Sequence, residues 1–313
     1  MDLLADVLRQ SGVKGRILDR ALVMTPMALR FPCERSFGFH VVTQGKAYIH
    51  TPDHNELIEL GSGDVALMAR GCNHIVSTAK ELPDEILSIE EGARLNGALA
   101  GTGKPLLSIV SGAYQVWNKP VHPFFAELPR WYLLRADEVG RFDQVDLAIN
   151  LLANETEKPD VGSETMTQAL VDIIFTQIIR KIIAQRNATP HTWSHALQNP
   201  QIRSALELMH TDCGHDWSLD ELAKRVGLSR AGFAQKFKAA LGSPPLQYLT
   251  TIRVQKAMDL LSNTPDKMEV VSQAVGYKDA FSFSKAFKKI AGIPPKEFRN
   301  RDREEKALSW RFQ

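Results

Sequence analysis

The spacing of apolar residues changes once along this chain. Between residues 36 and 80, short segments such as SFGFHVVTQG and AYIHT are separated by turn-forming Gly, Pro and Asp-His-Asn residues. Closely spaced short strands of this kind predict a small β-barrel or β-sandwich. After about residue 140, apolar residues recur at every third or fourth position, which predicts helices.

The widest apolar stripe belongs to a helix predicted over residues 164–186. Its centre line is Leu170, Ile174, Ile178 and Ile182, with further apolar residues on both sides. A helix that lies on one small domain needs a narrower stripe, so we expect burial on two sides. A second copy of the chain is the expected partner, and a core helix within one chain is the alternative. The polar, turn-rich residues 187–195 indicate a linker.

The last third of the chain repeats one phrase. FKAALGSPP at 237–245 recurs as FKKIAGIPP at 287–295. Each copy ends a pattern of short helix, Gly-containing turn (Gly227 or Gly276) and second helix, which is the helix-turn-helix arrangement. One helix predicted over 244–263 joins the two copies. Successive major grooves on one face of B-DNA lie about 34 Å apart, so this chain is expected to place recognition helices in two adjacent grooves.

Short polar side chains mark the starts of these four helices, because their oxygens accept hydrogen bonds from the first backbone N–H groups. The expected capping residues are Ser218, Ser229, Asp266 and Asp279. Glu residues three positions after the first and third of them complete the pattern of a capping box.

The recognition-helix faces opposite the buried phenylalanines are expected to contact DNA. Gln235 suits an adenine edge and Lys285 a guanine edge, and Ala231 or Phe281 suits a thymine methyl group. The remaining lysines suit phosphates, which position a protein without reading sequence. The alternative is a helical bundle with solvated lysines. The candidate DNA-binding residues are Ser229, Arg230, Ala231, Gln235, Lys238, Phe281, Ser282, Lys285, Lys288 and Lys289.

The charge distribution supports a polyanionic partner for the C-terminal part. The 313 residues have a formal net charge of only +2. Residues 196–313 nevertheless contain 19 Lys and Arg against 13 Asp and Glu, whereas residues 1–195 contain 19 against 23. A basic segment beside an acidic one predicts that only the former binds nucleic acid.

Other sequence features bear on location. The start, MDLLADVLRQ, lacks the basic and apolar regions of a secretory signal, and no run of eighteen apolar residues suggests a membrane partner. Three cysteines, Cys33, Cys72 and Cys213, do not form a disulfide framework. We therefore expect a cytoplasmic protein.

Residues 196–313 resemble the AraC/XylS family of bacterial transcription regulators. The resemblance rests on SLDELAKRVGLSRAGFAQKFKAALGSPPLQYL and AVGYKDAFSFSKAFKKIAGIPPKEFR, and covers nearly all of that segment. It implies double-stranded DNA as the partner, and RNA polymerase as well if the chain is an activator. The sequence departs from the family at two helix tips. Ala231 and Gly232 are small, which weakens base reading there, and Phe281 replaces a common polar residue, which favours apolar or shape readout.

The segment GDVALMARGCNH, residues 63–74, resembles the second cupin motif. Gly63, Gly71 and His74 fit the motif, whereas Ala69 replaces its proline. FPCERSFGFHVVTQGKAYI and WSHALQNPQIRSAL likewise resemble the cupin-type half and junction of one AraC subfamily. A metal-binding cupin also needs two histidines and a glutamate from its first motif, where this chain offers His40 alone. We therefore expect no metal cofactor, and a barrel that holds either a small effector or an empty apolar lumen.

Two cysteines of this region are candidates for redox sensing. Cys33 and Cys72 each lie two residues from an arginine, Arg35 or Arg70, which can lower a thiol pKa. Some regulators with this cupin-type half sense oxidants through cysteine, and the alternative is inert packing. The effector or redox candidates are Cys33, His40, Cys72 and His74.

Together these patterns predict an α+β protein with three parts. They are a cupin-like β-barrel over 1–140, a helical dimerisation segment and linker over 141–195, and an all-α domain with two helix-turn-helix motifs over 196–313. The predicted function is sequence-specific transcription regulation by a homodimer, modulated by the cupin-like domain, and not an enzymatic activity. The alternatives are a metal-dependent cupin enzyme and a non-specific architectural DNA binder.

Overall fold

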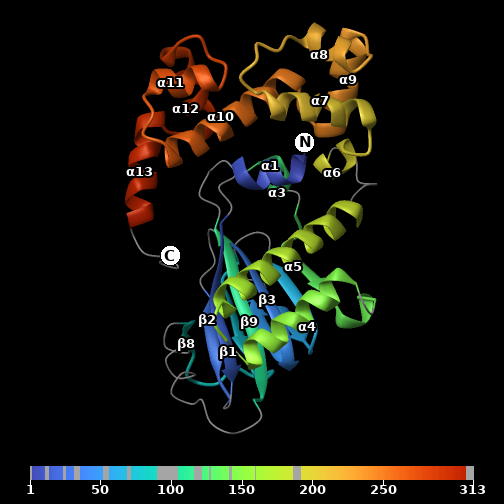
Figure 1. Cartoon of the computed structure of the whole chain (residues 1–313), viewed down its shortest axis with the longest axis vertical. Coiled ribbons are helices and arrows are strands. Elements are labelled where there is room, and N and C mark those ends of the chain that lie inside the picture. Colours follow the sequence, from blue (N-terminus) through green and yellow to red (C-terminus); the bar gives the residue numbers. More distant parts are fainter. Residues whose placement is uncertain are drawn as a thin grey trace. The chain divides into compact units, whose positions relative to one another are not determined.

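A computed structural model describes residues 2–10, 14–23, 26–31, 36–51, 56–68, 72–89, 105–115, 122–126, 128–140, 143–158, 160–185 and 192–307. The chain forms two compact units (Figure 1). The sheet unit contains the described residues of 14–115 and 128–181. The helical unit contains those of 1–13, 116–127 and 182–311. The mixed α+β class predicted from the sequence is confirmed.

The sheet unit contains two five-stranded sheets, ordered β1-β9-β3-β6-β10 and β5-β4-β7-β2-β8. All pairings are antiparallel except that of β2 with β8. The strands are β1 Lys14–Val23, β2 Ala28–Phe31, β3 Ser36–Gly45, β4 Ala47–Thr51, β5 Glu56–Leu60, β6 Val65–Met68, β7 His74–Ser77, β8 Leu87–Ser88, β9 Leu107–Gln115 and β10 Trp131–Leu134.

The strands of both sheets contribute to one buried core, in which Phe31, Val42, Ile49 and Met68 belong to the same cluster. Gly45 closes β3 with a φ of 85°. A Cβ at Gly45 would lie 2.1 Å from the carbonyl oxygen of Leu106, so only glycine fits there.

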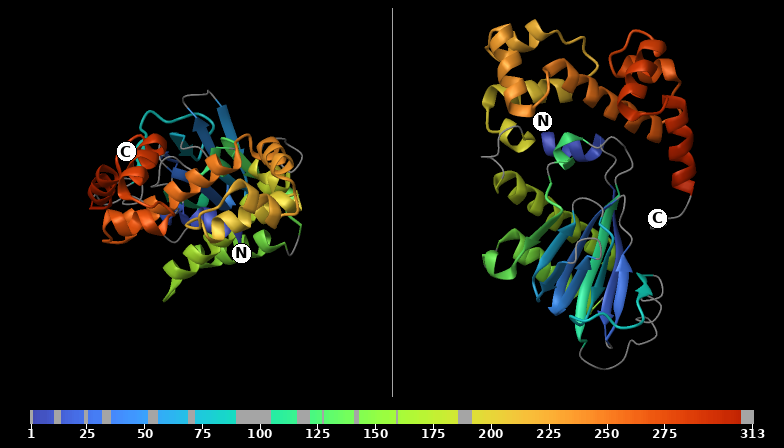
Figure 2. Two further views of the ribbon diagram at one scale, coloured as in Figure 1. Left: turned by 90° about the horizontal axis from the view of Figure 1, so that it is seen from above. Right: turned by 180° about the vertical axis from the view of Figure 1, so that it is seen from behind.

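Helices α4, Gln144–Glu157, and α5, Ser163–Gln185, lie on the other face of the first sheet (Figures 1 and 2). Ile174 and Ile178 of α5 line the same small space as Phe39 of β3 and Leu67 of β6. The whole predicted stripe, Leu170, Ile174, Ile178 and Ile182, is buried within one chain. The expectation that this stripe faces a second copy is therefore wrong, because the chain itself already buries it.

The helical unit is assembled from separate parts of the sequence. It includes α1, Leu3–Gln10, which contacts α7 and α10, and α3, Pro123–Ala126, which contacts α6. The other helices are α6 Trp193–Ala196, α7 Pro200–Thr211, α8 Leu219–Arg225, α9 Arg230–Leu241, α10 Pro245–Asn263, α11 Met268–Ala274, α12 Ala280–Ala291 and α13 Pro295–Ala307. Of the expected linker 187–195, residues 187–191 lie outside the described residues. The rest is not a linker, because Thr192 caps α6 and Trp193 is fully buried.

Three of the four expected caps are confirmed. The side chains of Ser218, Ser229 and Asp279 accept hydrogen bonds from backbone N–H groups at the starts of α8, α9 and α12. The fourth is wrong: α11 begins after Lys267, without a side-chain cap, so Asp266 lies one residue too early. In the part of the chain that the structure describes, no helix combines the length and apolarity needed to cross a bilayer.

Candidate nucleic-acid interface

The first helix-turn-helix motif consists of α8 and α9. Phe233 and Phe237 anchor α9 to the interior and are fully buried. Their spacing of four residues turns the opposite side of α9 to solvent. The five residues predicted to contact DNA are all exposed there: Ser229, Arg230, Ala231, Gln235 and Lys238.

The second motif consists of α11 and α12 and has the same design. Phe283 and Phe287 are fully buried, and Phe281 is 81% exposed at the start of α12. A large aromatic side chain in water gains nothing for folding, so its place at a recognition-helix tip favours a contact with a ligand. The five predicted residues of this motif are also exposed: Phe281, Ser282, Lys285, Lys288 and Lys289.

The two recognition helices are equivalent position by position. Each begins three residues before its first buried phenylalanine, directly after the caps Ser229 and Asp279. Each ends in a left-handed glycine from the repeated phrase, Gly242 with φ 72° and Gly292 with φ 78°. Helix α10 joins the motifs (Figure 1), and its 19 residues span about 28 Å.

Uncompensated positive charge lies on both faces. Lys238, Lys285, Lys288 and Lys289 form no ion pair with any described residue. Arg230 differs, because its guanidinium lies 3.2 Å from the carboxylate of Asp220. Three of the four unpaired lysines lie on α12, so the second face is the more basic one.

In the sheet unit, the two cupin-motif histidines meet. The Nε2 atoms of His40 and His74 are 2.6 Å apart, His40 Nδ1 lies 2.8 Å from the hydroxyl of Ser111, and His74 Nδ1 donates to the carbonyl of Cys72 at 2.9 Å. These bonds fix both tautomers if the rings are neutral: His40 donates to His74 and accepts from Ser111. Burial lowers the pKa of His40 well below its usual value and the pKa of His74 to about 4.

This pair does not fit a cupin metal site. The two ring nitrogens that would face a metal are hydrogen-bonded to each other. Among the described residues, no cluster of three or more His, Cys, Asp or Glu has a metal-binding arrangement. Cys33, Arg35, Ala69, Arg70 and Gly71 lie outside the described residues. Cys72 is half-buried beside the core, and redox sensing by it stays a prediction.

A small cavity lies between the two sheets. An apolar cavity of about 10 Å³ lies beside Leu29, Phe31, Val76 and Leu107 and has room for one water molecule. An effector in this lumen would have to move side chains, so the described residues fit a packed core better than an open pocket.

The family of this chain follows from both units. A family model described as cupin matches residues 2–184, more than half of the chain. A model described as a helix-turn-helix domain matches residues 222–301, which contain both recognition helices. The chain belongs to the AraC/XylS family and has a cupin-type N-terminal domain.

Named relatives of this AraC-type protein match it along most of its length. A putative AraC-like transcription regulator of Streptomyces lividans is 25% identical over 300 residues, 96% of this chain and 98% of that protein. The RCS-specific HTH-type transcriptional activator RclR of Escherichia coli (strain K12) is 27% identical over 267 residues, 85% of each chain. A crystal structure of an AraC-type transcriptional regulator from Chromobacterium violaceum, 29% identical, covers 34% of this chain and 96% of its own, with a TM-score of 0.33.

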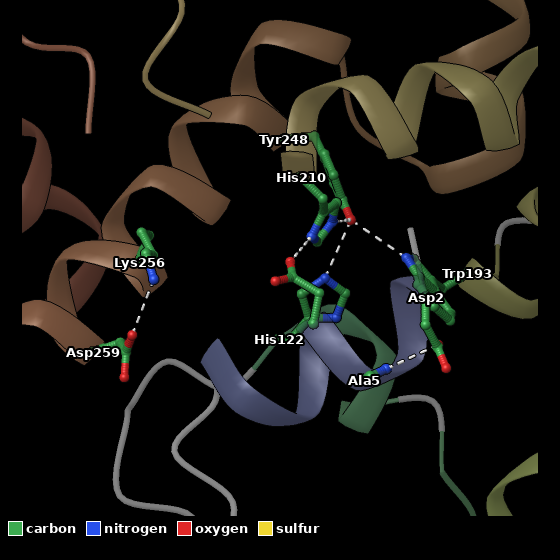
Figure 3. A network of polar contacts seen from close by, with 9 residues as sticks. Asp2, Ala5, His122, Trp193, His210, Tyr248, Lys256 and Asp259 are labelled. Carbon is green, nitrogen blue, oxygen red and sulfur yellow. Dashed lines mark hydrogen bonds and ion pairs between the residues drawn. The ribbon is translucent and has the colours of Figure 1, made fainter. Parts of the chain in front are cut away.

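Beneath the first motif of the AraC-type domain lies a buried polar network that the sequence did not reveal (Figure 3). Its centre is the hydroxyl of Tyr248 on α10. His210 Nε2 lies 2.9 Å from it, His122 Nε2 3.2 Å, and Trp193 Nε1 3.3 Å. His210 Nδ1 lies 2.8 Å from the carboxylate of Asp6 on α1. The network thus joins α1, α6, α7, α10 and the residue preceding α3.

One set of tautomers satisfies these bonds. The backbone N–H of Phe124 donates to His122 Nδ1, so neutral His122 donates from Nε2 to Tyr248. Tyr248 can then donate to His210, which donates to Asp6. The pKa of His122 lies well below its usual value, mainly because the ring is buried and secondly because His210 is its neighbour. Because the Tyr248 ring also packs 5.7 Å from that of Phe237, the network supports the anchor of α9.

Proposed function

We propose that this protein regulates transcription by inserting α9 and α12 into successive major grooves of a promoter. The observation that carries the proposal is the pair of equivalent recognition helices, each with an exposed polar face, joined by one continuous helix. The length of α10, about 28 Å, suits grooves about 34 Å apart once the recognition helices project from its ends. Relatives named as transcription regulators support the same function.

The exposed residues divide into two roles. Gln235 and Lys285 occupy equivalent central positions and are proposed to read an adenine and a guanine edge. Ala231 and Phe281 occupy the equivalent tips and are proposed to touch thymine methyl groups. Five polar or basic residues are proposed to hold phosphates, together with Ser282 at the second tip. These five are Ser229, Arg230, Lys238, Lys288 and Lys289.

The cupin domain is proposed to modulate this activity rather than to catalyse a reaction. Among the described residues, no third His, Cys, Asp or Glu joins His40 and His74 to form the ligand set that a metal-dependent cupin enzyme requires. A small effector and oxidation of Cys33 or Cys72 are the two candidate signals. An activator would also contact RNA polymerase. A DNA target supports the proposal that the protein acts in the cytoplasm. Metal analysis of the purified protein tests the enzyme alternative, because a stoichiometric transition metal would support it.

A homodimer is proposed on a different surface from the stripe predicted first. Leu147 and Leu151 on α4 are 46% and 50% exposed, and Met166 and Ile173 on α5 are 47% and 45% exposed. Each pair lies on the outer side of its helix, opposite residues that pack on the sheet. Two such helix pairs can bury these side chains against each other about a twofold axis.

Binding of the full-length protein to a random duplex library tests the proposed function. Enriched sequences should contain two blocks about one helical turn apart, bound roughly a thousandfold more tightly than unrelated DNA. Lys285→Ala should relax base preference in one block by about 1–3 kcal/mol, whereas Lys238→Ala should weaken all sequences alike. Equal affinity for every duplex would instead indicate an architectural DNA binder.

A further inference from the structure

The two helix-turn-helix motifs touch each other through one arginine of the connecting helix. Arg253 of α10 donates from Nε to the carbonyl of Cys213 at 2.7 Å and from Nη2 to the carbonyl of His215 at 2.7 Å. Both carbonyls belong to the loop that leads into the first motif. The guanidinium carbon also lies 5.6 Å from the ring centroid of Tyr277, in the turn of the second motif. One side chain therefore binds both motifs.

The backbones beside Arg253 are also in contact. A Cβ at Gly276 would lie 2.5 Å from the carbonyl oxygen of Gly214 and 2.8 Å from Arg253 Nη2. A Cβ at Gly214 would lie 2.9 Å from the carbonyl oxygen of Ala274. With a φ of 82°, Gly276 also has a conformation that favours glycine. The first loop and the second turn thus approach closely, without side chains between them.

This contact lies just before the first helix of the first motif and just before the recognition helix of the second motif. Gly276 and Tyr277 lie three and two residues before Asp279, the cap of α12. His215 lies three residues before Ser218, the cap of α8. Helix α10 alone fixes the distance between the motifs, whereas a second contact away from its axis also fixes their relative rotation.

We propose that Arg253 is a positioning residue that sets the spacing of the two DNA blocks this protein accepts. The proposal rests on the function proposed above. One base pair inserted between two blocks separates them by about 3.4 Å and rotates them by about 35°. A rigid pair of motifs loses DNA contacts when the blocks shift in this way, whereas two motifs joined by α10 alone can reorient and keep their contacts. Arg253 thereby determines specificity without touching DNA.

The test compares full-length wild type with Arg253→Ala on duplexes whose block separation is optimal, one base pair shorter or one base pair longer. Wild type should bind the altered duplexes about tenfold or more weakly, comparable with the loss of a base contact. In Arg253→Ala this ratio should fall to about threefold or less, because the motifs reorient more easily. Arg203→Ala is the matched control: among the described residues, this exposed arginine forms an ion pair only with Glu207 on its own helix, so its removal should keep the wild-type ratio.

Arg253→Lys provides a second variant if Arg253→Ala fails to fold. An ammonium group keeps the charge but cannot reproduce the planar fork between two carbonyls, so the ratio should again fall. Thermal melts show that each variant is folded. If a folded variant binds every spacing more weakly in the same proportion, Arg253 only stabilises the domain and the inference is overturned. If wild type itself shows no spacing preference, the two-groove function is refuted instead.

Discussion

The Tyr248 hydroxyl offers a sharp test of the buried network, because Tyr248→Phe removes one oxygen and keeps the ring. The change takes a hydrogen-bond partner from His122 Nε2 at 3.2 Å and from His210 Nε2 at 2.9 Å, and both rings are buried. A buried polar group that loses its partner costs about 1–3 kcal/mol. Two such groups give about 2–6 kcal/mol, and because local rearrangement relieves part of this, we expect the helical unit to lose about 3 kcal/mol of unfolding free energy.

Urea unfolding at pH 7.5, followed by tryptophan fluorescence, measures this loss, since buried Trp193 is itself part of the network. Tyr277→Phe is the matched control in the same unit, because the Tyr277 hydroxyl has no hydrogen bond to any described residue, and it should cost less than about 1 kcal/mol. If Tyr248→Phe costs no more than this control, the network does not stabilise the helical unit and the proposed tautomers are wrong.

Three further predictions concern the sheet unit. Burial holds the pKa of His74 at about 4 and also lowers the pKa of His40, so as the pH falls the unfolded chain binds these protons before the folded one does. The unfolding free energy should therefore fall by about 3 kcal/mol for His74 alone as the pH drops from about 6.5 to about 4. An unfolding free energy from urea melts that does not change over this pH range would contradict the prediction. Ile178→Asp should unfold the unit because Ile178 is buried, whereas Ile173→Asp should leave the unit folded and dissociate the proposed dimer because Ile173 is exposed. Sedimentation combined with thermal melts tests both variants. A folded Ile178→Asp protein would show that α5 is not packed on the sheet. Gly45→Ala should cost several kcal/mol, measured by the same melts, because its Cβ would collide with the backbone; a melt like wild type would refute the strained turn.

The helix-turn-helix repeat could be predicted from sequence because its determinants are local. Caps, buried phenylalanines and terminal glycines lie within a few residues of each other, and three of four expected caps are confirmed. The exception, Asp266, shows the limit of this approach. Helix α11 begins one residue later than expected, so the capping position falls on Lys267, whose side chain makes no capping hydrogen bond.

The partner of α5 could not be predicted, because a wide stripe reveals burial on several sides but not what buries it. A second signal was present in β3, where Phe37 through Val42 are all buried, so that both sides of this strand need a cover. The Tyr248 network had no signal at all. Its residues, from Asp6 to Tyr248, are scattered over most of the sequence, and only the tertiary fold brings them together.

The central claim is that one chain reads two adjacent major grooves. Hydroxyl-radical footprinting of full-length protein on an enriched site measures this most directly, because protection maps each contacted stretch of backbone on both strands. We predict that each chain protects two blocks on one face of the duplex, centred about one turn apart, and that Lys285→Ala weakens protection in only one of them. A single protected block per chain, or protection spread evenly along the duplex, would contradict the account.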